Sequence, residues 1–240
     1  MYMSRRSLMR GTGMLALAGI VPARALADET ATHVSADEAL AMLRAGNRAF
    51  VAGNARAYPF DDKRRREIAR GQTPFAAIVC CSDSRAGPEQ IFQAGLGELF
   101  VIRNAGNTTA SAQSLGSVEY SVAKVHVPLL VVLGHSKCGA VDAANAIVAG
   151  NARFPGSIEA MVEPIVPAAL AMRGAPGDPI ENSVRENVRR VVARLRSPDQ
   201  PLLYPPQREG KLRIVGAEYD LETGVVDFFD LPEPVAATEH

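Results

Sequence analysis

The fold is decided by residues 75–85, which read FAAIVCCSDSR. The stretch begins with a continuous apolar run over 75–81, which is typical of a strand buried on both faces of a sheet. A polar turn follows at once, and similar apolar runs occur at 99–102 and 129–133. The pattern predicts buried strands that carry polar residues at their carboxyl ends.

Helical patterns separate these strands. Alternation of strands and helices favours an α/β fold with a mostly parallel central β-sheet flanked by helices. The proline-rich stretch 198–206 predicts a loop, and the runs 212–217 and 225–229 predict a C-terminal strand and hairpin. Helices are expected near 110–124, 139–149, 158–172 and 184–195.

An N-terminal helical arm precedes the sheet. Ser35 and Glu38 form a capping box, in which a hydroxyl and a carboxylate each satisfy a free backbone amide. A short charged helix is expected over 61–70, and its basic run 63–66 is interpreted as a solvated face. No linker interrupts the rest, so we expect one domain over 28–240.

The overall composition excludes several classes of protein. The chain has 240 residues, of which 47% are hydrophobic, with 26 basic and 26 acidic side chains. A chain of this kind can bury a proper core, so it is neither disordered nor fibrous. Its formal net charge of zero offers no electrostatic argument for binding nucleic acid.

The first 27 residues differ from the rest because they contain four arginines and no acidic residue. An apolar stretch at 14–21 follows the basic start, and Ala25-Leu26-Ala27 has the small residues of a cleavage site. We expect 1–27 to be an export signal, which makes the mature protein periplasmic or otherwise exported. The stretch 4–8, SRRSL, resembles a twin-arginine signal, with an ordinary secretory signal as the alternative. The apolar part is too short to span a bilayer.

Three side chains predict a metal site. Cys81 ends the first apolar run, and His135 and Cys138 follow the third. The carboxyl ends of parallel strands meet at one edge of a sheet, so these residues are expected to lie together. Two thiolates and an imidazole are good zinc ligands, and three protein ligands leave the fourth position for water, as in catalytic zinc sites. Cys138 also begins an expected helix, whose free amides favour a thiolate.

Asp83 and Arg85 are the candidate catalytic pair. A turn would bring them together, and the guanidinium fork would then hold the carboxylate through two bonds. Such a carboxylate can accept a hydrogen bond from the nucleophilic water. The flanking Gly134 and Gly139 are interpreted as letting the backbone approach the metal.

The remaining candidate ligands are given structural interpretations. Cys80 points to the opposite face from Cys81 and is expected to be a buried apolar residue. His126 is expected to pack in the core, whereas His33 and His240 are expected to be solvated.

Taken together, these motifs resemble those of the β-class carbonic anhydrases. The resemblance covers nearly the whole mature chain and includes Gly71-Gln72-x-Pro74, Glu119-Tyr120 and Gly216-Ala-x-Tyr219. It rests above all on Cys81-x-Asp83-x-Arg85, His135-x-x-Cys138-Gly139 and the stretch from Gly97 to Arg103-x-Ala-Gly-Asn107.

The resemblance implies a function and a set of roles. Cys81, His135 and Cys138 would bind one Zn²⁺ per chain, with Asp83 as a possible fourth ligand in a closed state. Asp83 and Arg85 would orient the nucleophile for reversible hydration of carbon dioxide to bicarbonate. Substrate-binding positions of the plant-like branch correspond to Gln72, Phe100, Tyr120 and Gly139.

The resemblance further implies a homodimer or larger homo-oligomer, because part of the pocket comes from a neighbouring chain. Two other functions stay open at this point. One is a related zinc hydrolase that acts on a sulfur analogue of carbon dioxide, and the other is a zinc-binding protein without catalytic activity.

Overall fold

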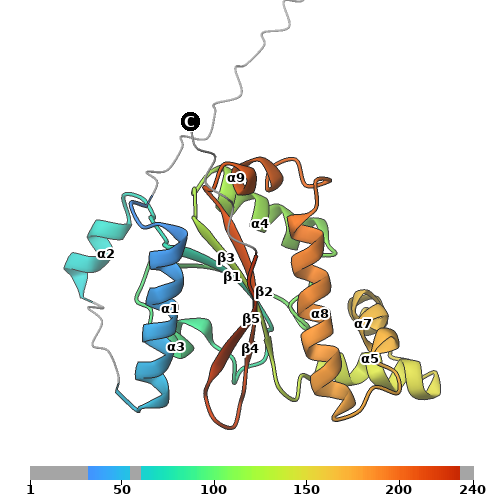
Figure 1. Ribbon diagram of the computed structural model, residues 1–240. Coiled ribbons are helices and arrows are strands. Elements are labelled where there is room, and N and C mark those ends of the chain that lie inside the picture. The colour runs from blue at the N-terminus through green and yellow to red at the C-terminus, as the bar shows by residue number, and fades with distance from the viewer. Residues whose placement is uncertain (1–31, 55–60, 233–240) are drawn as a thin grey trace, which may run out of the picture.

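Five strands form one central sheet in the order β2-β1-β3-β4-β5 (Figure 1). The structure is a computed structural model, and it describes residues 32–54 and 61–232. The first four strands along the chain are parallel, and β5 is antiparallel to β4. The strands are β1 (Ala76–Cys80), β2 (Leu99–Arg103), β3 (Leu129–His135), β4 (Arg213–Tyr219) and β5 (Val226–Asp230). The predicted fold class is confirmed, including the closing hairpin.

Both faces of the sheet are covered by helices. Every residue of β1 and β3 is buried, which explains why these strands are uninterrupted apolar runs. Ile78 and Cys80 face a cluster that includes Leu43 of α1, whereas Val79 faces a cluster that includes Val188 of α8. Cys80 is 1% exposed, so its interpretation as a buried apolar residue is confirmed.

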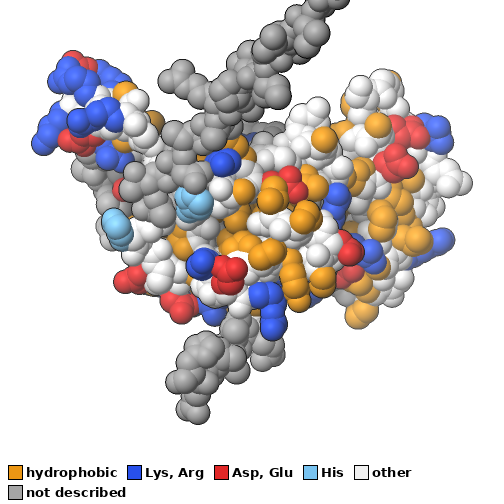
Figure 2. All heavy atoms as spheres, turned by 90° about the horizontal axis from the view of Figure 1, so that it is seen from above, with side chains coloured by type: hydrophobic (Ala, Val, Ile, Leu, Met, Phe, Trp, Pro, Cys, Tyr) orange, Lys and Arg blue, Asp and Glu red, His pale blue; other side chains and the backbone are white. Residues whose placement is uncertain are grey.

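The helices begin where the local sequence supplies a cap. The Ser35 hydroxyl accepts the Glu38 amide, and the Glu38 carboxylate accepts the Ser35 amide at 2.8 Å, so the capping box is confirmed. The helices that surround the sheet are α1 (Ala36–Val51), α2 (Asp62–Ile68), α3 (Pro88–Ile91), α4 (Ala112–Ala123), α5 (Gly139–Gly150) and α8 (Pro179–Arg196). None of the residues of α2 is buried, and its charged side chains gather at one corner of the molecule (Figure 2).

Prolines account for three differences from the predicted elements. The helix expected over 158–172 is divided into α6 (Ile158–Val162), a 3₁₀ turn at Glu163–Ile165 and α7 (Val166–Ala171), because Pro164 and Pro167 lack a backbone donor. Helix α8 begins earlier than expected because Asp178 caps it and Pro179 suits the first helical position. The stretch expected to be a loop contains a short helix, α9 (Tyr204–Arg208), with prolines in its first turn.

Two further points concern single residues and membranes. His126 is exposed and has a positive φ of 59°, so the prediction that it packs in the core is wrong. It lies in the tight connection between α4 and β3, where the backbone geometry turns its side chain outward. His33 is exposed, as expected.

In the described ranges no helix has the length and apolar character that crossing a bilayer requires.

Candidate metal centre

Cys81, His135 and Cys138 converge at the carboxyl end of the sheet. Cys81 follows β1, His135 ends the adjacent parallel strand β3, and Cys138 is the N-cap residue of α5. All three are buried, and one ligand atom from each lies within 4.8 Å of the others. The two sulfurs are 3.9 Å apart and form no disulfide. The convergence that the sequence predicts is therefore confirmed.

The donor atoms fit a zinc ion. In tetrahedral coordination with Zn–S bonds of about 2.3 Å, two sulfurs lie roughly 3.8 Å apart, close to the separation observed. His135 Nδ1 is 2.9 Å from the Ser136 carbonyl oxygen, which assigns the ring proton to Nδ1. The lone pair on Nε2 then faces the sulfurs, and this buried atom has no hydrogen-bond partner among the described residues. An unpaired buried acceptor beside two thiols is explained by a metal ligand.

The electrostatics of the three ligands favour a cation. The Cys138 thiol, whose sulfur is 3.9 Å from that of Cys81, lowers the pKa of Cys81 to about 4, against the effect of burial. The same contact and burial raise the pKa of Cys138, although the amides at the start of α5 lower it. Burial lowers the pKa of His135, but the Cys81 thiolate, the Ser136 carbonyl and Asp83 together raise it above its ordinary value. The amides at the start of α5 thus favour the Cys138 thiolate, as the sequence predicts, but the adjacent Cys81 thiolate and burial oppose it. Two adjacent negative charges require a cation between them.

Asp83 and Arg85 form a closed pair beside the ligands. Arg85 Nε donates to Asp83 Oδ1 at 2.9 Å, and Nη2 donates to Oδ2 at 2.7 Å. The predicted turn is confirmed, because the Arg85 amide also donates to Asp83 Oδ1. This bidentate bond holds the pKa of Asp83 far below its ordinary value. Asp83 Oδ2 lies 3.9 Å from His135 Nε2, so an ionised acceptor stands at the edge of the metal site.

Arg103 and Gly106 support the first ligand, and the sequence analysis assigned them no role. Arg103 at the end of β2 donates to the carbonyl oxygens of Cys81 at 2.9 Å and Asp83 at 2.7 Å. The Gly106 amide donates to Cys81 Sγ at 3.4 Å. Gly106 has a φ of 76°, and an added Cβ would lie 2.3 Å from Ile165 Cδ1, so only glycine fits. The signal was present in the stretch from Arg103 to Asn107, but it did not indicate a contact with Cys81.

The two glycines that flank the second motif are explained differently from the prediction. A Cβ on Gly134 would lie 2.8 Å from Val188 and 3.0 Å from Val184, so this glycine allows α8 to approach β3. A Cβ on Gly139 would meet nothing within 4 Å in this chain. Neither glycine is required for a close approach to the metal by its own chain.

The predicted substrate-binding side chains lie at the other end of the sheet. The rings of Phe100 and Tyr120 stack with centroids 6.2 Å apart. Phe100 pairs with Ala77, four positions before Cys81, which corresponds to about 13 Å along the strand. Gln72 precedes β1 at this same end. Within one chain these residues do not join the metal ligands, and Tyr120 is 36% exposed.

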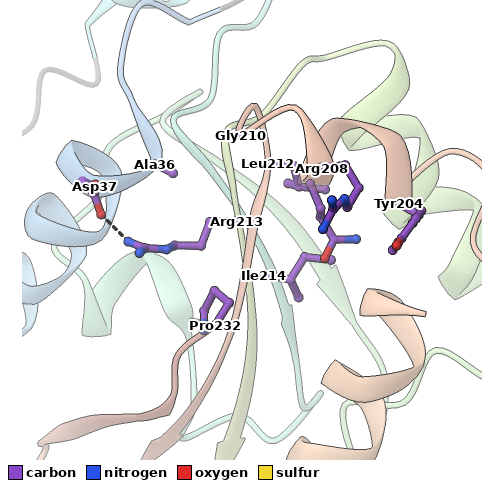
Figure 3. A pocket seen from close by; sticks show the side chains of 10 residues that line it. Ala36, Asp37, Tyr204, Arg208, Gly210, Leu212, Arg213, Ile214 and Pro232 are labelled. Carbon is purple, nitrogen blue, oxygen red and sulfur yellow. Dashed lines mark hydrogen bonds and ion pairs between the residues drawn. The ribbon is translucent and has the colours of Figure 1, made fainter. Parts of the chain in front are cut away.

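A cavity of about 330 Å³ lies near the start of β4, at the end of the sheet opposite the sulfurs (Figure 3). Asp37 and Arg213 form an ion pair on one side, and Arg208 and Tyr204 lie on the other (Figure 3). The Asp37–Arg213 pair neutralises two of its charges, and none of the buried polar atoms without a partner among the described residues belongs to its lining. Its position and chemistry separate this cavity from the metal centre.

Comparisons with known proteins point to one family. The sequence model of a family described as "Carbonic anhydrase" matches residues 76–226. Carbonic anhydrase 2 of Mycobacterium tuberculosis is 39% identical over 184 residues, which cover 76% of this chain and 87% of that protein. The structure of the β-carbonic anhydrase CcaA matches with a TM-score of 0.61 and 28% identity, over 70% of this chain and 89% of that one.

A further structural match concerns two tetrameric β-carbonic anhydrases from the fungus Sordaria macrospora. The TM-score is 0.63 at 22% identity, and the match covers 77% of this chain and 93% of that chain. This match supports the fold.

Proposed function

The chain belongs to the β-carbonic anhydrase family, and from this premise we propose how its residues divide the work of catalysis. The protein is a zinc-dependent carbonic anhydrase that hydrates carbon dioxide reversibly to bicarbonate and a proton. The observation that carries this conclusion is the buried Cys81–His135–Cys138 group, with its unpaired Nε2 atom, in a chain that matches the family. We assign the catalytic pair to Asp83 and Arg85.

The roles of this pair follow from their contacts. The two sulfurs and His135 Nε2 would hold a zinc ion, which would make a bound water acidic enough to supply a nucleophile near neutral pH. Arg85 keeps the Asp83 carboxylate ionised and oriented through two bonds, so Asp83 Oδ2 only accepts hydrogen bonds. Asp83 Oδ2 therefore accepts a hydrogen bond from the attacking water, and a lone pair on the water oxygen stays directed at the substrate. Because both Asp83 oxygens are bound by Arg85, this geometry favours the catalytic role over direct ligation of the metal.

We propose that a second copy of the chain completes the substrate pocket. Gln72, Phe100 and Tyr120 correspond to pocket positions of the plant-like branch, yet they lie far from the sulfurs of their own chain. The exposed Tyr120 ring and the position of β2 at the edge of the sheet, as far as the described residues form it, support an interface at this end of the molecule. The site of one chain would then be lined by the pocket residues of the partner, together with the backbone of the first chain near Gly139.

Complementation between inactive variants tests the shared site. One chain carries D83N, and the other carries Q72A and Y120A. Each homo-oligomer is expected to be nearly inactive, whereas a refolded mixture regains activity because some sites combine an intact Asp83 with intact pocket residues. Stopped-flow hydration of carbon dioxide and zinc content per chain are measured together. A mixture no more active than its components would contradict the shared pocket and leave the zinc assignment intact.

We propose that residues 1–27 direct export of a folded single domain, 28–240, by a twin-arginine pathway. This segment lies outside the described residues, and the proposal is supported by its basic start, apolar stretch and small-residue cleavage site. Export after folding would let the thiols bind zinc in a reducing compartment. Replacement of Arg5 and Arg6 by lysine is expected to retain the protein in the cytosol. Normal export of that variant would refute the twin-arginine assignment.

A further inference from the structure

The turn between His135 and Cys138 contains an unfavourable backbone conformation. Lys137 has a φ of 55°, in the left-handed region that residues with a Cβ rarely adopt. This turn joins two metal ligands, so a change in the backbone conformation of Lys137 would move the His135 imidazole relative to the Cys138 sulfur. Contacts from elsewhere in the fold must hold this conformation.

Ser136 and Lys137 are held from two different directions. The Ser136 amide donates to the Tyr219 carbonyl at 3.0 Å, and the Leu221 amide donates to Ser136 Oγ at 2.9 Å. These bonds attach Ser136 to the β4–β5 hairpin. The Lys137 amide instead donates to Glu181 Oε1 at 2.9 Å, across 44 residues of sequence. The left-handed residue is thus attached to the first turn of α8.

Glu181 lies beside a cluster of charged groups, of which Glu218 is the most buried. Burial raises the pKa of Glu218 on β4, as does the electrostatic interaction of Glu218 with the Glu181 carboxylate, and Glu218 Oε2 accepts from Arg185 Nη1 at 2.8 Å. The Arg185 guanidinium also donates to Asp227 and lies 4.0 Å from the centre of the Phe229 ring. Glu218 Oε1 is buried and has no hydrogen-bond partner among the described residues. The Glu181 side chain therefore interacts with a carboxylate that Arg185 holds in place.

We propose that Glu181 is a positioning residue for the metal centre, because its carboxylate holds the Lys137 amide and thereby sets the relation of His135 to Cys138. Glu181 lies in neither sequence motif and contacts no ligand atom. Its effect on catalysis passes through the turn. The inference rests on the zinc site described above.

Zinc release and the spectrum of the cobalt-substituted protein test this role. In E181A, zinc transfer to a chelating dye is expected to accelerate about tenfold, which corresponds to the loss of one charge-assisted hydrogen bond. The cobalt absorption bands are expected to shift, because they report the geometry of the ligands. E181Q retains an acceptor oxygen and is expected to stay within about threefold of the natural protein. The matched control is E186A, which removes a carboxylate from the same helix that binds only Arg189 and Arg190.

A second variant guards against a general loss of stability. E181D keeps a negative charge at the start of α8, where it is favourable, but its side chain is too short to reach Lys137. We expect E181D to unfold at the same temperature as the natural protein and to release zinc as fast as E181A. Release at the natural rate in E181D, or failure of E181Q to rescue, would overturn the proposal. A natural protein without bound zinc would instead overturn the zinc assignment itself.

Discussion

The two loops that carry the metal ligands are held in opposite ways. The loop after β1 is fixed largely through its carbonyl oxygens, which accept hydrogen bonds from the Arg103 guanidinium, although the Ser82 amide also donates to the Asn104 carbonyl at 3.2 Å. The turn after β3 is fixed mainly through its amides, which donate to the Tyr219 carbonyl and the Glu181 carboxylate. The first loop depends on a guanidinium donor, whereas the second depends on a carbonyl and a carboxylate as acceptors.

This difference indicates a division of labour. The first loop carries one ligand together with Asp83 and Arg85, so changes there are expected to alter the rate of reaction. The second loop carries two ligands and is expected to govern zinc retention. Four variants test this division.

Loss of a sulfur ligand should have the largest effect, whichever loop supplies it. C81S is expected to bind little zinc and to lose about 10³-fold or more in kcat/KM, because the nucleophile is no longer generated. C80A changes the adjacent residue, whose burial raises the pKa of its thiol to about 12, and should keep both zinc and activity. Metal analysis and stopped-flow assays distinguish these outcomes. Equal loss of zinc in C80A would contradict the ligand assignment.

D83N should separate the rate of reaction from zinc retention. An amide can donate as well as accept, and it loses the charge that Arg85 binds, so kcat/KM is expected to fall about 10²-fold. Zinc content and the rate of zinc release should stay unchanged, because Asp83 is not a ligand in this geometry. The S84A variant in the same loop serves as the control. Faster zinc release from D83N would break the proposed division between the loops.

The carboxylates behind the second loop should make its stability depend on pH. Burial and the Glu181 carboxylate raise the pKa of Glu218 to about 7, above its ordinary value of 4.5. Between these values the folded protein keeps a proton that the unfolded chain releases, so this group destabilises the fold as the pH rises through this window. In E218Q this position cannot titrate, so the variant does not lose stability in this way as the pH rises.

Urea unfolding of both proteins at pH 5, 6, 7 and 8 measures the effect of Glu218. The free energy of unfolding of the natural protein, relative to E218Q, is expected to fall from pH 5 to about pH 7 and then level off. Arg185, Glu181 and Asp227 are present in both proteins, so the difference isolates Glu218. A constant difference across this range would show that Glu218 is already ionised in the fold.

The smallest effect is expected from S136A. The Leu221 amide loses its acceptor, which costs about 1 kcal/mol in the free energy of unfolding. Zinc release should accelerate by less than in E181A, because the Ser136 amide still binds the Tyr219 carbonyl. The matched substitution S82A in the first loop should leave zinc release unchanged. If S82A released zinc faster than S136A, the second loop would not govern retention.

Much of the fold could be predicted because local rules and burial agree. The apolar runs that became β1 and β3 have a length and composition that only a doubly covered strand explains. The errors occur where local rules compete. The residues over 158–172 have helical periodicity, but Pro164 and Pro167 divide the helix, and the prolines of 198–206 proved compatible with the first turn of α9.

The metal ligands could be predicted from the sequence, whereas the residues that hold them in place could not. Cys81, His135 and Cys138 stand directly after strands whose carboxyl ends must meet, so strand order along the chain is enough to bring them together. Arg103, Gly106 and Glu181 act through long-range hydrogen bonds that have no periodic pattern. The position of Phe100 and Tyr120 away from the sulfurs also required the sheet register.

The sequence by itself determined the fold class, the three ligands and the Asp83–Arg85 pair, because residue type and strand ends are local properties. Only the tertiary structure decided which atom of His135 faces the sulfurs and how close the two sulfurs lie. It also decided which distant groups hold each loop. These properties depend on burial and on distances of a few ångströms between residues far apart in the chain, and no local pattern encodes such distances.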